Sequence, residues 1–157
     1  MFLSFLSCDA DVVESLRAGG QDVYGNPAEL TIYEGVGAPC RCCLDNVPYG
    51  KEMLICAARL FLHDCSLMLK PARFSCALIV ACRLRETIVR RFLKYSPIFL
   101  VKAYNADQRI MYGTGQITES KMVAQYAQEL FDRGDVSFVD VRSAKNNCFF
   151  TRIVTQE

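Results

Sequence analysis

The chain has a single histidine, His63, and its 18 basic and 17 acidic residues nearly cancel, leaving a net charge of +1. This balance gives no broad positive field to attract nucleic acid or an anionic membrane, so we expect neither as a partner. Cysteine–histidine catalysis is also disfavoured, because a thiol without a nearby base is mostly protonated at neutral pH. The segment Gly113-Thr114-Gly115 lacks the third glycine and the lysine of a phosphate-binding loop.

No apolar stretch is long enough to span a bilayer, the segment from Phe74 to Cys82 being far too short. The apolar start, Met1 to Cys8, has no basic residue before it and meets Asp9 at once, unlike a secretory signal. The nine cysteines are odd in number, and Cys42 and Cys43 are adjacent, which argues against a disulfide scaffold. These observations predict a cytoplasmic protein with reduced thiols.

The composition is that of a folded chain, with 52% hydrophobic and 22% charged residues over 157 positions. This length suits one domain, residues 1–157, which can bury a core without metals or disulfides. We see no internal repeat and no low-complexity segment.

Hydrophobic periodicity predicts two helices. Residues Asp9 to Ala18 form a short one, capped by Asp9 or Asp11 and ended by two glycines. Residues Glu119 to Arg133 form the longer one, with Thr118 as its N-cap and a continuous apolar stripe. That stripe is typical of core packing rather than of a cofactor site.

Several apolar segments predict strands, and one pair predicts a hairpin. The hairpin runs from Pro97 to Gly113 and turns at Asn105–Gln108, so that residues 109–112 form its returning strand. The other expected strands are residues 30–33, 52–61, 136–141 and 148–155. The fold class is therefore α+β: a mostly antiparallel sheet with one packed amphipathic helix and a short N-terminal helix.

Polar and reactive side chains gather in two segments, residues 37–44 and 142–149. Arginine can bind a carboxylate or phosphate with two parallel hydrogen bonds, and asparagine adds donors and acceptors. We therefore predict a pocket for a small anionic ligand. The candidate ligand-binding residues are Arg41, Arg142, Ser143, Asn146 and Asn147. In the alternative interpretation, Arg142 pairs with Asp140 or Asp107 and the asparagines only form the turn.

The same segments carry candidate metal ligands, Cys40, Cys43 and Cys148. Cys40 and Cys43 have the Cys-x-x-Cys spacing of zinc sites, and Cys42, Cys65 or His63 could be a fourth ligand. One such pair without a second is a weak zinc signal. Zinc is a possible cofactor, so the ligand held between the two segments is either a small anion or a metal.

The pair Cys40 and Cys43 could instead be a redox dithiol, with Arg41 lowering the pKa of a thiol. The turn-forming residues after Cys43 suit the helix of such a motif poorly. A third interpretation is that these thiols only pack in the core, where free cysteine behaves as a small hydrophobe. No pattern in the sequence names a reaction or its catalytic residues.

The segments PCRCCL, YNADQRIMYGTG and VSFVDVRSAKNNCFFTRI resemble a bacterial family known as domain of unknown function 1203. Members of that family are small single-domain proteins with an early PCRxCL block and a late RSxxNNCF block. The resemblance extends from about Gly37 to Ile153, with one gap. What it implies is modest, because the family has no established activity.

The gap lies before the predicted hairpin, where family members resemble PYAETGPIFL followed by a cysteine. Permissible codons for the residues from Met68 onward, read one base earlier, give YAETGPIFLCADRC. We therefore hypothesise that residues from about 62 to about 85 are translated out of the family's frame by two compensating shifts. His63, Cys65, Cys76 and Cys82 would then carry no chemistry. Resequencing the DNA tests this, since codons incompatible with the shifted peptide would refute it.

Overall fold

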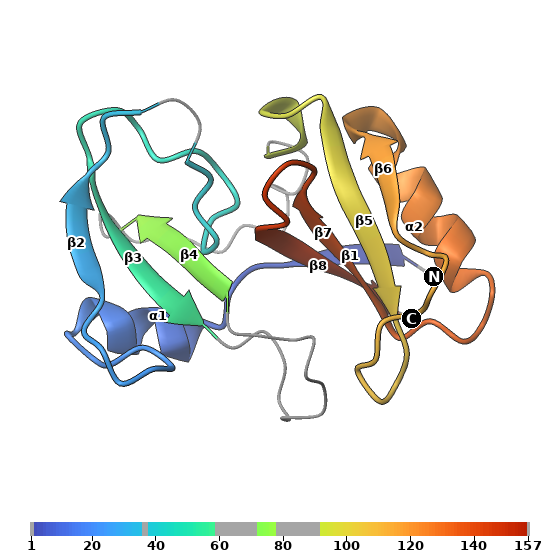
Figure 1. Cartoon of the computed structure of the whole chain (residues 1–157), viewed down its shortest axis with the longest axis horizontal. Coiled ribbons are helices and arrows are strands. Elements are labelled where there is room, and N and C mark those ends of the chain that lie inside the picture. Colours follow the sequence, from blue (N-terminus) through green and yellow to red (C-terminus); the bar gives the residue numbers. More distant parts are fainter. Residues whose placement is uncertain (1, 36–37, 59–71, 78–91, 157) are drawn as a thin grey trace. The chain divides into compact units, whose positions relative to one another are not determined.

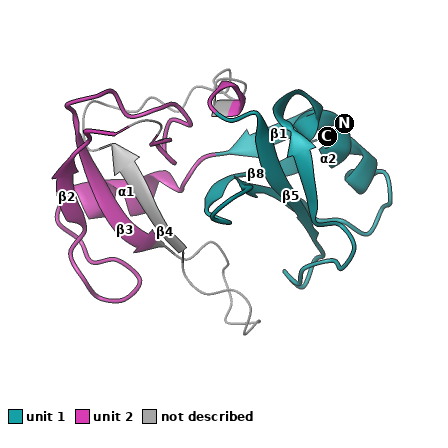
Figure 2. Cartoon of the chain, turned by 45° about the horizontal axis from the view of Figure 1, so that its top comes forward, with its two compact units in different colours: residues 1–6, 61–69, 96–157 teal, residues 7–60, 70–95 magenta. Residues whose placement is uncertain are grey.

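A computed structural model describes residues 2–35, 38–58, 72–77 and 92–156. The described residues form two compact units, shown in different colours in Figure 2. Unit 1 contains residues 2–6 and 96–156, and unit 2 contains the described residues between 7 and 95. Each unit is described below by itself, and the single domain expected over residues 1–157 stays a prediction.

Unit 1 is a five-stranded antiparallel sheet with one helix (Figure 1). Its strand order is β1-β8-β7-β5-β6. The elements are β1 (Phe2–Leu6), β5 (Ile98–Tyr104), β6 (Gln116–Glu119), the 3-10 turn η2 (Ser120–Met122), α2 (Val123–Phe131), β7 (Phe138–Ser143) and β8 (Phe149–Gln156). The mostly antiparallel α+β architecture is thus confirmed.

The core of unit 1 follows from the alternation of side chains along its strands. Phe99 and Val101 of β5, Val139 and Val141 of β7 and Ile153 of β8 have no exposed surface. Helix α2 contacts β5, β6 and β7. Its buried residues are Val123, Ala127, Leu130 and Phe131.

Two predicted boundaries in unit 1 are wrong. The predicted helix start at Glu119 belongs to β6, where Glu119 pairs with Ile98, and α2 begins only after the 3-10 turn. The turn at Asn105 is confirmed, but the returning residues 109–112 form no full strand: Ile110 bridges to Tyr104 at the end of β5, and the strand partners of β5 are β6 and β7. In both places the local sequence pattern did not show how β5 pairs: β6, which contains Glu119, and β7 are its neighbours in the sheet.

Unit 2 is a three-stranded antiparallel sheet of order β2-β3-β4 with helix α1. Its elements are α1 (Ala10–Arg17), β2 (Glu29–Ile32), β3 (Glu52–Ala58), β4 (Ala72–Ala77) and the 3-10 turn η1 (Phe92–Lys94). The Asp9 side chain accepts hydrogen bonds from the first turn of α1, which confirms the predicted cap. Sequence periodicity missed β4, which lies within the segment hypothesised to be out of frame, and also missed β1 and β6 of unit 1.

The rest of that segment lies outside the described residues, and so do His63, Cys65 and Cys82. Neither helix in the described ranges combines the length and apolar character needed to cross a bilayer.

Candidate functional site

The loop after β7 is built around Arg142, Ser143 and Asn147. A β-bulge between Val141 and Arg142 precedes it. Ser143 then donates its N–H to the Cys148 carbonyl at 2.8 Å and accepts the Asn147 N–H at 3.0 Å. Asn147 has a φ of 56°, a left-handed conformation that asparagine tolerates better than most residues. The predicted polar turn therefore exists, and it holds Asn147 beside Arg142.

Arg142 is buried, with 8% of its surface exposed. Its Nη1 donates to the Asn147 carbonyl at 2.9 Å and to Asn147 Oδ1 at 3.3 Å. Its Nε is buried and has no hydrogen-bond partner within the described ranges. Leaving a buried donor unsatisfied costs about 1–3 kcal/mol, so this N–H is a place where an acceptor would be stabilising.

Lys102 reaches the same asparagine from β5. Its Nζ donates to Asn147 Oδ1 at 3.3 Å, the atom that also accepts from Arg142. Partial burial lowers the pKa of Lys102, the neighbouring Arg142 guanidinium lowers it further, and Asp140 opposes the shift more weakly. Two cations therefore converge on one uncharged oxygen.

Asp140 pairs with Arg152 across the strands β7 and β8. The carboxylate has no exposed surface and accepts from Arg152 Nε at 2.8 Å and from Arg152 Nη2 at 3.3 Å. Burial raises the pKa of Asp140, while Arg152 acts in the opposite direction. The interpretation in which Asp140 is the main partner of Arg142 is thus not the arrangement found.

We call the residues of this region the polar cluster. Cross-strand neighbours share one face of a sheet, and the pairs Lys102–Asp140 and Asp140–Arg152 are such neighbours. The Arg152 guanidinium lies 3.7 Å above the centre of the Phe138 ring, which stacks on Tyr104. The polar cluster consists of Lys102, Tyr104, Phe138, Asp140, Arg142 and Arg152. Its charged members are three cations and one carboxylate.

Sequence reasoning found Arg142 and Asn147 but missed Lys102 and Arg152. A signal was present, because each interrupts an otherwise apolar strand, in FLVKAY and FFTRIV. Of the other predicted residues in this loop, Ser143 accepts the Asn146 N–H on its hydroxyl, and the Asn146 side chain is exposed. These two shape the loop.

Residues 38–44 of unit 2, which we call the cysteine loop, are also closed by a backbone hydrogen bond between residues four apart. Leu44 donates its N–H to the Cys40 carbonyl at 2.9 Å and has a φ of 54°. Arg41, with 5% of its surface exposed, donates to the Pro39 carbonyl. Its own carbonyl accepts the Cys8 N–H at 2.9 Å. The loop is thus held by backbone contacts.

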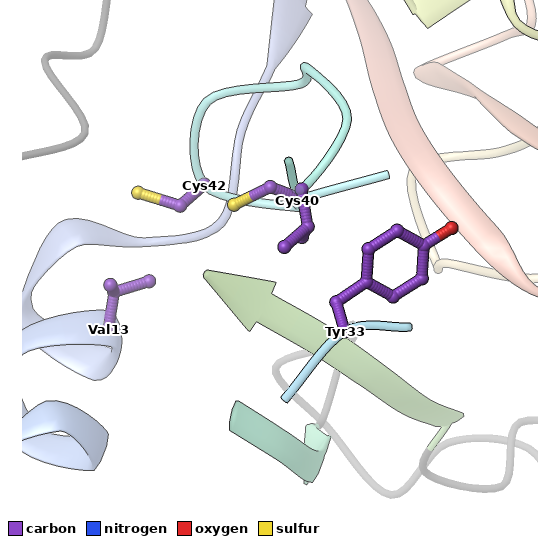
Figure 3. Close-up of a cluster of buried hydrophobic side chains, with 5 residues drawn as sticks. Val13, Tyr33, Cys40 and Cys42 are labelled. Carbon is purple, nitrogen blue, oxygen red and sulfur yellow. The ribbon is translucent and has the colours of Figure 1, made fainter. Parts of the chain in front are cut away.

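The thiols of this loop lie in an apolar cluster (Figure 3). Cys40 has no exposed surface and Cys42 has 5%, and they pack with Val13, Tyr33 and Val47. Nearby, burial raises the pKa of Cys8 to about 12. A buried thiol among apolar side chains behaves as a small hydrophobic packing group.

The metal and redox predictions gain no support from this arrangement. No three potential metal-binding side chains gather anywhere among the described residues. Cys40 and Cys43 belong to unit 2, whereas Cys148 belongs to unit 1. The zinc site and the Cys40–Cys43 dithiol stay predictions.

Comparison with known protein families identifies the family of this chain. A family model described as a protein of unknown function (DUF1203) matches residues 37–154. The chain belongs to the DUF1203 family. The match confirms the resemblance drawn from the sequence motifs, and its residues include the cysteine loop and the whole polar cluster of this DUF1203 member. No curated protein and no solved structure matches the chain.

Proposed function

We propose that this DUF1203 protein binds a small anion, a carboxylate or a phosphate, at the polar cluster, with Arg142 as its main contact. The observation that carries the proposal is the buried Nε of Arg142, which has no acceptor among the described residues. Buried donors in native proteins are nearly always hydrogen-bonded, so a ligand oxygen is the natural acceptor here.

The charge of the polar cluster supports the same proposal. Asp140 is paired with Arg152 in a two-point contact, and Lys102 and Arg142 both donate to the neutral Asn147 side-chain oxygen. An anion near these two cations gains charge-assisted hydrogen bonds, which are about twice as strong as neutral ones. The proposal uses residues of unit 1 alone, and Arg41 stays a prediction as a second contact.

Calorimetric titration of the full chain with sodium acetate and sodium phosphate, at constant ionic strength, tests this function. We expect at least one of the two anions to bind, and Arg142→Lys to weaken its binding about tenfold, since lysine keeps the charge but lacks the Nε donor.

The matched control is Lys145→Gln, which removes an exposed cation from the same loop and should leave the affinity nearly unchanged. If neither anion binds, or if both variants weaken binding equally, the proposed function is wrong.

A further inference from the structure

Asn147 places its side-chain oxygen between two cations. Asn147 Oδ1 is 3.3 Å from Lys102 Nζ and 3.3 Å from Arg142 Nη1. The asparagine itself is exposed, and its loop position is fixed through its backbone, by the contacts of its N–H to Ser143 and of its carbonyl to Arg142. The carboxamide can therefore rotate away while the loop stays closed.

We infer that the anion is a phosphate group in its dianionic form, which replaces the Asn147 carboxamide oxygen between Lys102 and Arg142. This inference rests on the proposed function and narrows it to one ligand chemistry. The group could belong to free phosphate or to a phosphate ester.

Charge and geometry both favour phosphate over a carboxylate. A carboxylate neutralises only one of the two cations, whereas a phosphate group carries close to two negative charges above pH 7. Its several oxygens can accept from the Lys102 ammonium and from the Nη1 and Nη2 groups of the Arg142 guanidinium at once. The lowered pKa of Lys102 is consistent with this, because partial burial and the nearby guanidinium both disfavour its charge and Asp140 opposes them more weakly.

The test compares inorganic phosphate, methyl phosphate and acetate by calorimetric titration of the full chain at pH 8 and constant ionic strength. We expect inorganic phosphate, methyl phosphate or both to bind at least about tenfold more tightly than acetate, since each added charge-assisted contact contributes about that factor. Tight binding of inorganic phosphate alone identifies the free ion, and tight binding of methyl phosphate identifies an ester. Lys102→Gln should reduce phosphate affinity to that of acetate.

A second variant keeps the inference open to refutation if Lys102→Gln fails to fold. Asn147→Asp places a permanent carboxylate between the two cations, so it should weaken phosphate binding by about tenfold or more without removing any cation. Asn146→Asp is the matched control, with the same charge change one residue away on an exposed side chain, and should weaken binding far less.

The outcomes separate the two proposals. If acetate binds as tightly as phosphate and Arg142→Lys weakens both, the phosphate inference is wrong while anion binding stands. If no anion binds, both are wrong. If Asn146→Asp and Asn147→Asp weaken phosphate binding equally, the phosphate does not lie between Lys102 and Arg142.

Discussion

The cysteine loop of unit 2 and the Arg142 loop of unit 1 share a backbone design. Each is closed by an N–H to a carbonyl four residues earlier, at Leu44 and Asn147, and each of these residues has a left-handed φ, 54° or 56°. In each loop a buried arginine donates to a nearby carbonyl, Arg41 to Pro39 and Arg142 to Asn147. Their difference therefore lies in the side chains around them.

In unit 2 those side chains are apolar. Leu44 is buried despite a φ that costs leucine about 1–2 kcal/mol, and the neighbouring thiols pack with Val13. In unit 1 the left-handed residue is an exposed asparagine that faces two cations. The same loop geometry thus presents a buried apolar residue in unit 2 and an exposed polar residue beside two cations in unit 1.

We expect the largest loss of stability when the buried Asp140 carboxylate of unit 1 loses its partner Arg152. Arg152→Met leaves the Asp140 carboxylate buried without its two-point partner, so we expect the free energy of unfolding at pH 7 to fall by about 3–5 kcal/mol. Denaturant titration measures it. Arg133→Met, which breaks an exposed ion pair with Asp135, should cost about 0.5 kcal/mol or less. Equal losses in both variants would refute the role given to the buried pair.

The next largest effect concerns the two residues with a left-handed φ, Leu44 and Asn147. Leu44→Ala removes a buried side chain and should lower the free energy of unfolding by about 2–3 kcal/mol, whereas Asn147→Gly should change it by no more than about 0.5 kcal/mol. Denaturant midpoints of the two variants provide the measurement. A large loss in Asn147→Gly would mean that both loops are packing elements.

The smallest effect concerns the thiols of unit 2. Burial raises the pKa of Cys56 from 9.0 to about 11, so the unfolded chain releases the proton at a lower pH than the folded one. The stability that Cys56 contributes is full below pH 9 and declines as pH rises from 9 to about 11. We therefore expect the destabilisation caused by Cys56→Ala to shrink by about 2 kcal/mol between pH 8 and pH 11. A constant difference under reducing conditions would contradict the shift.

The general fold could be predicted from sequence because its signals are local. Apolar stretches identified most of the strands, the capping aspartate identified the start of α1, and asparagine identified the turn after β7. The start of α2 could not be predicted, because Glu119 suits a helix start as well as a strand and only its pairing with Ile98 decides between them.

The polar cluster depends on contacts between distant residues. Arg142 and Asn147 lie in one polar segment, so the sequence pointed to them. Lys102 reaches Asn147 only because β5 pairs with β7, and Arg152 reaches Asp140 only because β8 pairs with β7 in one particular register. Such registers are set by the whole sheet, so a lysine or arginine in an apolar strand could be noticed but not assigned a partner.

The pairing of β1 with β8 has a consequence for how the protein is made. Among the described strands β1 neighbours β8 alone, and the Thr151 hydroxyl donates to the Leu6 carbonyl at 2.7 Å. On the ribosome, residues 2–6 must therefore wait for residues 149–156 to be synthesised, while β2 and β3 of unit 2 can pair long before. Because domains synthesised earlier usually fold first, the nascent chain would complete its polar cluster last and carry an unpaired first strand until then.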